Sequence, residues 1–407
     1  MTTARELEKR YGAGNYAPLP VTLVRGEGVH LWDDDGRRYL DMLGAYSAVS
    51  FGHCHPRLVA ALSAQAGTLD ILSRVYSTDR LGPFMARACE LTGMDRALPM
   101  NTGAEAVETA LKAARKWAYK VKGVADDQAE IIAAKGNFHG RTIAVTGLST
   151  VAQYRDGFGP FPPGFKLVPF GDAKALEAAI TPNTAAFLVE PIQGEGGIIV
   201  PPEGYFAEVE RICRAHDVLL ICDEVQTGLG RTGKLLAHQH EGITPDGITL
   251  GKALGGGLVP VSMFLAREEV MGVFNPGDHG STYGGNPIAA AVGLAALDLL
   301  IEDDLVERAR DLGDYMLGRL NGIDSPAIRE VRGRGLFAGI EIDPGAGKAI
   351  EVVEALLHAG VLTKETHRNT VRMAPPFVIE KSEIDEAVDR LAEVLEAIAA
   401  DAPMARG

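Results

Sequence analysis

The stretch ITLGKALGGG, residues 248–257, places Lys252 directly after an apolar run that reads as a buried strand. Burying a lysine ammonium group costs free energy unless the group has a partner or a chemical task. An earlier apolar run, VLLICD at 218–223, ends in Asp223. Because α/β sheets bind ligands at the carboxyl ends of their strands, we expect Asp223 and Lys252 to face one crevice.

The chain around these runs alternates short apolar segments with amphipathic helical segments, from about residue 60 to about residue 290. The apolar runs are nearly continuous, which is typical of a mostly parallel sheet covered by helices on both faces. We therefore predict an α/β fold. Its strands are expected at 130–134, 185–189, 218–222 and 261–265, and helices at 105–122 and 205–216.

Three regions follow from this pattern. Residues 1–50 form an N-terminal segment with a β-hairpin, expected to pack with a smaller C-terminal domain. Residues 51–290 form the large α/β domain, and residues 291–407 form a linker helix and a small α+β domain. Ser382 and Asp385 predict a capping box at the start of the last helix.

The composition narrows the class of protein. The chain has 407 residues and a formal net charge of -14, which argues against nucleic acid or an anionic membrane as a partner. The N-terminus shows no secretory signal, and no apolar run is long enough to span a membrane. The few cysteines in so long a chain favour reduced thiols and a cytoplasmic location.

Two local motifs suggest other chemistry. The segment GLGRTGK, residues 228–234, fits two nucleotide-binding patterns. Residues 224–227 separate it from its strand, and Leu235 replaces the hydroxyl residue of a phosphate-binding loop, so a mobile glycine loop is the better interpretation. A nucleotide-binding protein remains a remote alternative. The run His53-Cys54-His55 predicts no metal site, because three consecutive residues rarely converge on one ion.

The features around Lys252 fit one cofactor together. Residues 101–105 precede an alanine-rich helix whose first N–H groups could hold a phosphate, and residues 280–285 offer hydroxyl groups and close backbone approach. Pyridoxal 5'-phosphate (PLP) needs a reactive lysine, an acid beside its ring nitrogen and a phosphate cradle. Taken singly, Asp223 reads as a strand-end charge and Lys252 as a surface lysine. Their occurrence as an ordered set favours the cofactor.

These features belong to six blocks that resemble the class III PLP-dependent aminotransferases of fold type I. The blocks are NTGAEAVETALKAARKW (101–117), GNFHGRT (136–142), VEPIQGEGG (189–197), DEVQTGLGRTG (223–233), LGKALGGG (250–257) and HGSTYGGNP (279–287). The resemblance implies a large domain with a mostly parallel, seven-stranded sheet and a smaller α+β domain. It also implies a homodimer or higher homo-oligomer that acts on small molecules.

The resemblance implies two sets of cofactor residues. Lys252 and Asp223 are the implied catalytic pair, with Lys252 bonded to the cofactor and Asp223 paired with its ring nitrogen. Contacts with the cofactor are implied for Gly103, Ala104, Phe138, Asp223, Val225, Gln226, Lys252, Ser281 and Thr282, the threonine reaching a neighbouring subunit.

Within the family, the chain resembles the members that transfer the δ-amino group of L-ornithine to 2-oxoglutarate. The supporting stretches are NYAPLPV (15–21), AYSAVSFGHCHP (45–56), GFGPFPPGF (157–165) and VRMAPP (371–376). Substrate contacts are implied for Tyr16, Tyr46, Arg141, Glu195 and Arg372. Arg141 would bind the α-carboxylate, Tyr16 the α-amino group, and Glu195 would mask Arg372 until a dicarboxylic partner displaces it.

Two departures from the ornithine pattern leave alternatives open. His139 stands where the resembled enzymes often carry an aromatic residue, and Gly196 gives the motif GEGG, which also occurs in relatives that act on acetylornithine. A transaminase for acetylornithine or 4-aminobutyrate on the same scaffold is therefore the alternative.

Overall fold

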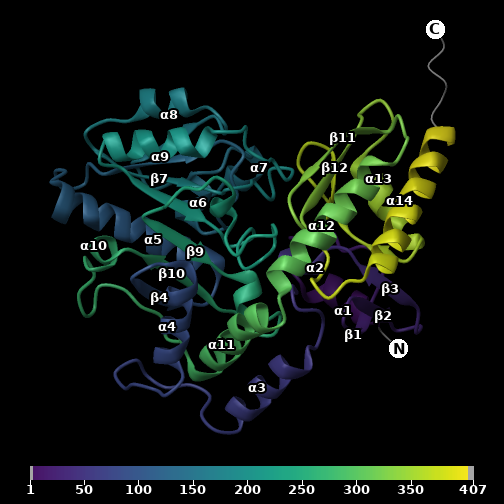
Figure 1. Ribbon diagram of the computed structural model, residues 1–407, viewed down its shortest axis with the longest axis horizontal. Coiled ribbons are helices and arrows are strands. Elements are labelled where there is room, and N and C mark those ends of the chain that lie inside the picture. The colour runs from purple at the N-terminus through teal and green to yellow at the C-terminus, as the bar shows by residue number, and fades with distance from the viewer. Residues whose placement is uncertain (1–2, 402–407) are drawn as a thin grey trace.

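The computed structural model describes residues 3–401 (Figure 1). A helix-covered central sheet lies on one side of the molecule and a C-terminal unit of sheet and helices on the other. The predicted linker helix is α11 (Pro287–Glu302), and α12 (Leu305–Asn321) follows it into the C-terminal unit. The predicted α/β fold is therefore confirmed. Residues 402–407 of the predicted C-terminal region, 291–407, lie outside the described residues.

The central sheet has seven strands in the order β4-β10-β9-β8-β7-β5-β6. The five strands from β9 to β6 are parallel, and β10 runs antiparallel to both of its neighbours. This is the mostly parallel sheet that the sequence predicts. Its strands are β4 (Arg96–Met100), β5 (Glu130–Ala134), β6 (Phe165–Val168), β7 (Thr184–Val189), β8 (Leu219–Asp223), β9 (Gly247–Leu250) and β10 (Ser262–Ala266).

Helices cover this sheet, as Figure 1 shows. Every residue of β7, β8, β9 and β10 is buried, which explains why these strands read as continuous apolar runs. The surrounding helices are α3 (Pro56–Ala66), α4 (Leu81–Thr92), α5 (Gly103–Trp117), α6 (Ile143–Gly147), α7 (Ala152–Arg155), α8 (Ala173–Ala179), α9 (Tyr205–Ala215) and α10 (Glu268–Met271). Shorter helical turns are η1 (Ala118–Lys122), η2 (Ala237–His240) and η3 (Lys252–Gly255).

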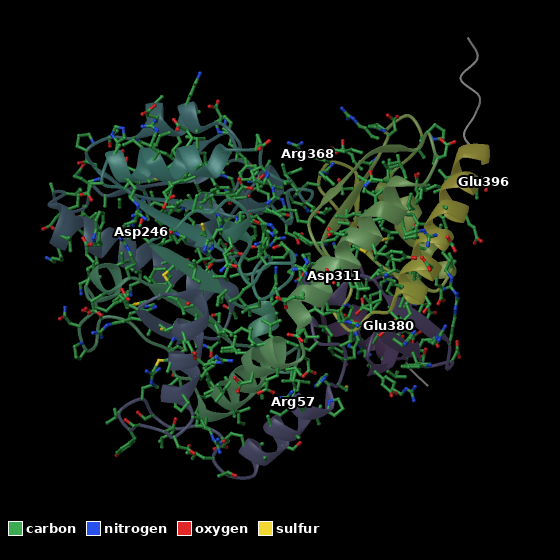
Figure 2. All side chains as sticks on the ribbon, in the orientation of Figure 1. Arg57, Asp246, Asp311, Arg368, Glu380 and Glu396 are labelled. Carbon is green, nitrogen blue, oxygen red and sulfur yellow. The ribbon has the colours of Figure 1, made fainter. Side chains whose placement is uncertain are left out.

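A buried carboxylate aligns the two strands that lead to Asp223 and Lys252. Asp246, labelled in Figure 2, precedes β9, and its Oδ2 accepts the backbone N–H of Leu220 in β8 at 2.7 Å. Its Oδ1 accepts a hydrogen bond from Arg214 of α9 at 2.5 Å. In the resulting register Asp223 lies opposite Thr249, so both strands end at one edge of the sheet.

Two four-stranded sheets complete the fold. The first, β1-β2-β3-β13, joins the predicted N-terminal hairpin to the C-terminal region, because β13 pairs in parallel with β3. The second, β11-β12-β15-β14, is called the C-terminal sheet below. The remaining elements are α1 (Ala4–Tyr11), β1 (Leu23–Glu27), β2 (His30–Asp33), β3 (Arg38–Asp41), α2 (Gly44–Ser47), β11 (Ile328–Gly333), β12 (Ala338–Ile342), α13 (Ala349–His358), β13 (Val361–Leu362), β14 (Lys364–Thr366), β15 (Thr370–Met373) and α14 (Lys381–Asp401). We propose domain boundaries near residues 50 and 290.

The predicted start of the last helix is wrong. Helix α14 begins at Lys381, so Ser382 lies inside its first turn and cannot act as the N-cap. The side chain of Glu383 instead accepts the backbone N–H of Glu380 at 2.8 Å. Asp385 is engaged elsewhere, because its Oδ1 accepts a hydrogen bond from the Tyr315 hydroxyl at 2.6 Å. Within residues 3–401, the helices are all too short or too polar to cross a membrane.

Candidate active site

Asp223, at the end of β8, is fixed by hydrogen bonds to both of its carboxylate oxygens. Oδ2 accepts from His139 Nδ1 at 2.6 Å, and Oδ1 accepts from the Thr249 hydroxyl at 2.8 Å and the Val225 N–H at 3.1 Å. Burial alone would raise the pKa of Asp223, but these hydrogen bonds and the charge of His139 hold the pKa below its usual range. The carboxylate is therefore ionised and oriented.

Lys252 follows β9 and opens the turn η3. Its φ of 47° lies in the left-handed region, which is rare for a residue with a side chain and common at functional sites. Burial, with a contribution from Arg372, lowers the pKa of the amine to about 8, although Glu195 and Asp223 oppose this shift. The amine is therefore far easier to deprotonate than an exposed lysine.

Val225 brings the strand ends and the start of α5 together. A Cβ on Gly103, the first residue of α5, would lie 2.8 Å from Val225 Cγ1, and one on Gly251 would lie 3.3 Å from the same atom. Thr102 and Glu105 cap the helix reciprocally, with the Glu105 N–H to Thr102 Oγ1 at 3.2 Å and the Thr102 N–H to Glu105 Oε2 at 2.7 Å. This cap leaves the first N–H groups of the helix free for an anion.

The loop between α10 and α11 approaches the same helix start. Ser281 Oγ accepts a hydrogen bond from Asn101 Nδ2 at 2.8 Å, which places this predicted cofactor residue beside Gly103 and Ala104. Thr282, the next residue, is exposed. The structure of a single chain therefore brings Ser281 to the helix start and leaves Thr282 facing outward.

Glu195 and Arg372 form an ion pair close to Lys252. Arg372 Nη1 donates to Glu195 Oε1 at 2.5 Å, and both groups influence the pKa of Lys252. The side chain of Arg372 is fully buried, whereas that of Glu195 is 21% exposed. Among the described residues, Arg372 Nε and Nη2 have no hydrogen-bond partner. Such unpaired, buried donors are a ready site for a carboxylate.

Tyr46 and Gln226 lie next to this pair. The guanidinium carbon of Arg372 is 5.2 Å from the centre of the Tyr46 ring. Tyr46 belongs to a short run with left-handed φ angles, and its carbonyl oxygen accepts a hydrogen bond from Gln226 Nε2 at 3.3 Å. Gln226 is itself buried against Gly194, where an added Cβ would lie 1.8 Å from its Oε1.

Arg141 lies against two aromatic rings. Its guanidinium carbon is 3.7 Å from the centre of the Tyr154 ring and 5.1 Å from that of Phe138. Phe138 is held in turn by its backbone N–H, which donates to Glu190 Oε2 at 3.0 Å. Arg141 is exposed and makes no hydrogen bond with another residue of the described chain, so its five N–H donors are available to a ligand.

Tyr16 is the predicted site residue that the structure leaves apart from the others. It lies between α1 and β1, and 74% of its surface is exposed. It lines a hollow of about 900 Å³ together with Asp33 and Tyr39 of the N-terminal sheet. Within residues 3–401 it makes no hydrogen bond with the cluster around Lys252.

Sequence reasoning missed Glu190 as a site residue. Glu190 follows β7 directly, much as Asp223 ends β8. Its position at the end of a strand could have identified it from the sequence as a site residue. Burial raises the pKa of Glu190 to about 7, against the opposing charge of His139. Its two oxygens accept the N–H groups of Phe138 and Gly194, at 3.0 and 3.2 Å, so it ties the Phe138 loop to the Glu195 loop.

The predicted mobile loop at 228–234 is wrong, because most of this loop is buried. Arg231 is 1% exposed and donates to the carbonyl oxygens of Leu336 and Pro375 at 2.9 and 2.6 Å. A Cβ on Gly233 would lie 2.9 Å from the Cα of Arg310. Gly233 thus allows close packing against the C-terminal unit.

Comparisons with known proteins agree with this geometry. The family model for class-III aminotransferases matches residues 11–395. An ornithine aminotransferase of Geobacillus sp. (strain WCH70) is 54% identical over 388 residues, which cover 95% of this chain and 97% of the relative.

Solved structures give the same result. A structure of the ornithine aminotransferase of Toxoplasma gondii, with partial occupancy of PLP at its active site, superposes with a TM-score of 0.95 and 44% identity, covering 98% of this chain and 96% of the other. An acetylornithine aminotransferase of Elizabethkingia anophelis superposes with a TM-score of 0.87 and 44% identity, covering 97% and 98%. The family match spans nearly the whole chain, and the chain belongs to the class-III aminotransferases.

Proposed function

We propose that this chain transfers the δ-amino group of L-ornithine to 2-oxoglutarate, using PLP, to give glutamate and glutamate 5-semialdehyde, which cyclises to pyrroline-5-carboxylate. One observation carries the choice of substrates. Arg372 is fully buried beside Lys252, and two of its nitrogens have no partner among residues 3–401. Glu195 closes it off at 2.5 Å. A site that admits a cationic amine and then a dicarboxylate needs such a maskable arginine.

The residues present fit PLP. A lysine with a pKa near 8 and an oriented carboxylate follow neighbouring strands, and the N-terminus of the 15-residue helix α5 lies beside them with Gly103 packed against Val225. Gly103 and Ala104 would hold the phosphate through their N–H groups, and Ser281 would add its hydroxyl. Phe138 and Val225 would flank the ring and Gln226 would lie near its phenolic oxygen. When bound, PLP supplies an aldehyde that bonds to amines and a ring that accepts the electrons of a breaking C–H bond.

Lys252 and Asp223 handle the protons of the reaction. Lys252 reaches the neutral state near its pKa of about 8, so its Nζ can take a proton from substrate carbon and return it. Asp223 stays ionised, because its own hydrogen bonds keep its pKa low, and it would hold a proton at the ring nitrogen of the bound cofactor. His139 and Thr249 prevent this carboxylate from turning away.

Arg141, Glu195 and Arg372 select the two substrates in turn. Arg141 binds the α-carboxylate of ornithine as a bidentate pair, with Tyr16 on the α-amino group and Tyr46 beside the chain. The Glu195–Arg372 pair stays closed during this half of the reaction. 2-Oxoglutarate then displaces the partly exposed Glu195 side chain, and its second carboxylate pairs with Arg372.

The active unit is a homodimer, in which Thr282 completes the phosphate site of the neighbouring subunit. This assembly is supported by three largely exposed apolar residues near Thr282, namely Val75, Tyr76 and Tyr283. Arg74 Nη1 donates to the Gly284 carbonyl at 3.3 Å, which brings the two segments together. A cytoplasmic location is supported by the four cysteines, all of which are free.

Substrate comparison tests the proposal. Initial rates with 2-oxoglutarate should be much higher for ornithine than for N-acetylornithine or 4-aminobutyrate, and Tyr16→Phe should lower kcat/KM for ornithine only. Faster turnover of N-acetylornithine would assign the chain to the alternative specificity that Gly196 and His139 leave open.

A further inference from the structure

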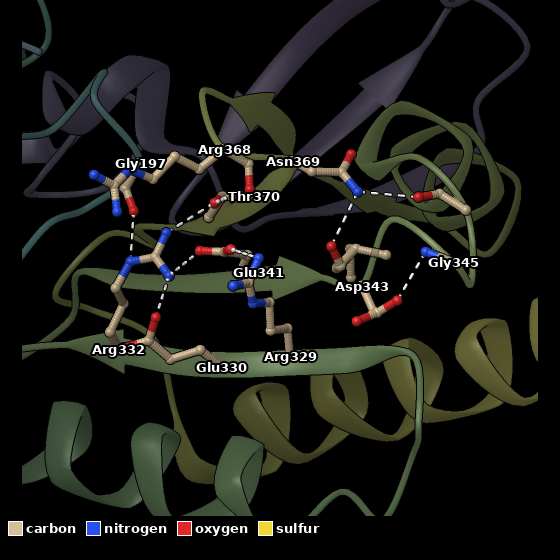
Figure 3. A network of polar contacts seen from close by, with 12 residues as sticks. Gly197, Arg329, Glu330, Arg332, Glu341, Asp343, Gly345, Arg368, Asn369 and Thr370 are labelled. Carbon is tan, nitrogen blue, oxygen red and sulfur yellow. Dashed lines mark hydrogen bonds and ion pairs between the residues drawn. The ribbon is translucent and has the colours of Figure 1, made fainter.

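The turn at residues 194–198, which carries Glu195, follows β7 of the central sheet. It is nevertheless held by side chains of the C-terminal sheet. A bridge between Gln193 and Ile199, with N–H···O bonds of 3.1 and 3.0 Å, closes its base. Beyond this base, the backbone oxygens of Glu195 and Gly197 contact the C-terminal unit, whereas the Gly194 oxygen accepts the N–H groups of Gly197 and Ile198 within the turn, at 3.2 and 3.1 Å. The Thr366 hydroxyl donates to the Glu195 carbonyl at 2.6 Å. Arg332 Nε donates to the Gly197 carbonyl at 2.8 Å, as Figure 3 shows.

Each guanidinium nitrogen of Arg332 donates at least one hydrogen bond. Its Nη1 donates to Glu341 and Glu330 at 2.6 and 2.8 Å, and its Nη2 donates to Thr370 at 2.9 Å, as Figure 3 shows. Its side chain is only 8% exposed. Two carboxylates and a hydroxyl thus fix the guanidinium group so that Nε points at Gly197.

The register of the C-terminal sheet places Arg332 and Arg372 on either side of the turn. Arg332 lies opposite Gly339 on β12, and Gly339 lies opposite Arg372 on β15, so the three form one row on one face. The turn rests on the gap that Gly339 leaves. A Cβ on Gly339 would lie 3.2 Å from both the Gly197 oxygen and the Ile198 Cβ. One arginine therefore holds the backbone of the turn and the other pairs with its Glu195 side chain.

The turn is strained, so it needs these contacts. Gly197 has a φ of 112° and Ile198 a φ of 54°, and a β-branched residue rarely adopts the left-handed region. Such strain persists only where the surroundings over-determine it. Ile198 is fully buried in a small cluster with Ile192, Phe337 and Ala374, separate from the main core.

We propose that Arg332 is a positioning residue that locks the backbone of residues 194–198, so that only the Glu195 side chain moves when Arg372 is opened to a dicarboxylate. This inference rests on the proposed function. Loosening the lock weakens the Glu195–Arg372 pair, which leaves Arg372 more open. Dicarboxylates then bind more tightly, and ornithine, which needs a masked Arg372, is used less well.

The test measures the dissociation constant of glutarate, a dicarboxylate without a reacting carbonyl, for the holoenzyme by calorimetry. Arg332→Gln should tighten glutarate binding by roughly threefold to tenfold and lower kcat/KM for ornithine by a similar factor. Arg332→Lys keeps the positive charge but loses the planar guanidinium group. Its dissociation constant for glutarate should therefore lie between those of Arg332→Gln and the unaltered enzyme. Arg329→Gln is the matched control, since Arg329 pairs with Glu341 at 3.4 Å and makes no described contact with the turn.

A double-mutant cycle separates positioning from general destabilisation. In a Glu195→Ala background, Arg332→Gln should leave glutarate binding unchanged, because the group it positions is gone. If Arg332→Gln folds poorly, Gly339→Ala serves as the second test. Its added Cβ pushes on the Gly197 oxygen and should change glutarate binding as Arg332→Gln would. The inference would be overturned if Arg332→Gln changed glutarate binding equally with Glu195 present and with Glu195→Ala. It would also be overturned if the variants at Arg332 and Gly339 bound glutarate as Arg329→Gln does. Glutarate binding needs no turnover, so an enzyme inactive on ornithine would count against the proposed function alone.

Discussion

His139 Nδ1 and Asp223 Oδ2 lie 2.6 Å apart in a part of the site where both side chains are almost fully buried. Burial alone would lower the pKa of His139, but the hydrogen bond and charge of Asp223, with Glu190, outweigh it and raise the pKa above its ordinary value of 6.5. These interactions favour the charged form of the pair, and the hydrogen bond holds Asp223 in place for the cofactor ring.

Replacing this histidine should have a pH-dependent cost in stability. The raised pKa of His139 gives stability that is fully present below its unfolded value of 6.5 and is lost as the pH rises through the folded value. The free energy of unfolding of His139→Gln should therefore be lower than that of the unaltered protein by about 3 kcal/mol at about pH 6. At about pH 9 the difference should be smaller. Denaturant titrations of the cofactor-free proteins at the two pH values measure this difference. A deficit that grows toward high pH would show that the histidine is neutral in the pair.

Removing the Lys252 amine should stop turnover without unfolding the protein. Lys252→Ala is expected to lower kcat by at least about 1,000-fold, because proton transfer loses its base. The cofactor should still bind through the helix start and Asp223. Steady-state rates and equilibrium dialysis with PLP measure both effects, and Lys234→Ala, at an exposed lysine, serves as the control. Appreciable transamination by Lys252→Ala would remove the lysine from the mechanism.

A larger residue at Gly103 should be tolerated only if the Val225 side chain is made smaller. The Cβ of Gly103→Ala would lie 2.8 Å from Val225 Cγ1, so the helix start must shift. Overpacking of this kind costs about 1–3 kcal/mol, which corresponds to a rise in the Kd for PLP of roughly 5- to 150-fold. The second change Val225→Ala should restore part of the affinity. Gly318→Ala, where no atom lies within 4 Å, should leave PLP binding unaltered, and a similar loss there would contradict the packing argument.

Arg231 should be essential for stability rather than for binding. Its Nη1 and Nη2 donate to Leu336 O, Pro375 O and Ser50 Oγ, and burial lowers its pKa to about 9. A lysine cannot reach all three acceptors, so Arg231→Lys should lose about 2–4 kcal/mol of unfolding free energy. Denaturant midpoints test this against Arg310→Lys, at an exposed position of α12. Equal midpoints would mean that the three contacts contribute nothing.

The parts of the fold and site that the sequence predicts are those set by local pattern. Continuous apolar runs predict β5, β7, β8 and β10 to within a residue or so, since burial on both faces excludes polar residues. The run at 218–223 locates Asp223 at the end of β8, and the run at 248–250 places Lys252 just after β9.

The parts that the sequence does not predict depend on contacts between distant segments. Arg332 and Gly197 are 135 residues apart, and Thr366 and Glu195 are 171 apart, so no spacing rule connects them. The glycine run at 228–234 misleads for the same reason, because its glycines allow close packing against distant residues such as Leu250, Leu300 and Arg310. Tyr16 shows a further limit, since a residue implied by resemblance is exposed in the N-terminal segment.

The most direct test of the account follows the nitrogen atom. Ornithine labelled with heavy nitrogen only at the δ position is incubated with 2-oxoglutarate and the holoenzyme, and both products are examined by mass spectrometry. The account predicts that the label appears in glutamate and that the cyclised product carries none. Label retained in the cyclised product, with unlabelled glutamate, would mean that the α-amino group is transferred and would contradict the assignment of Arg141, Glu195 and Arg372.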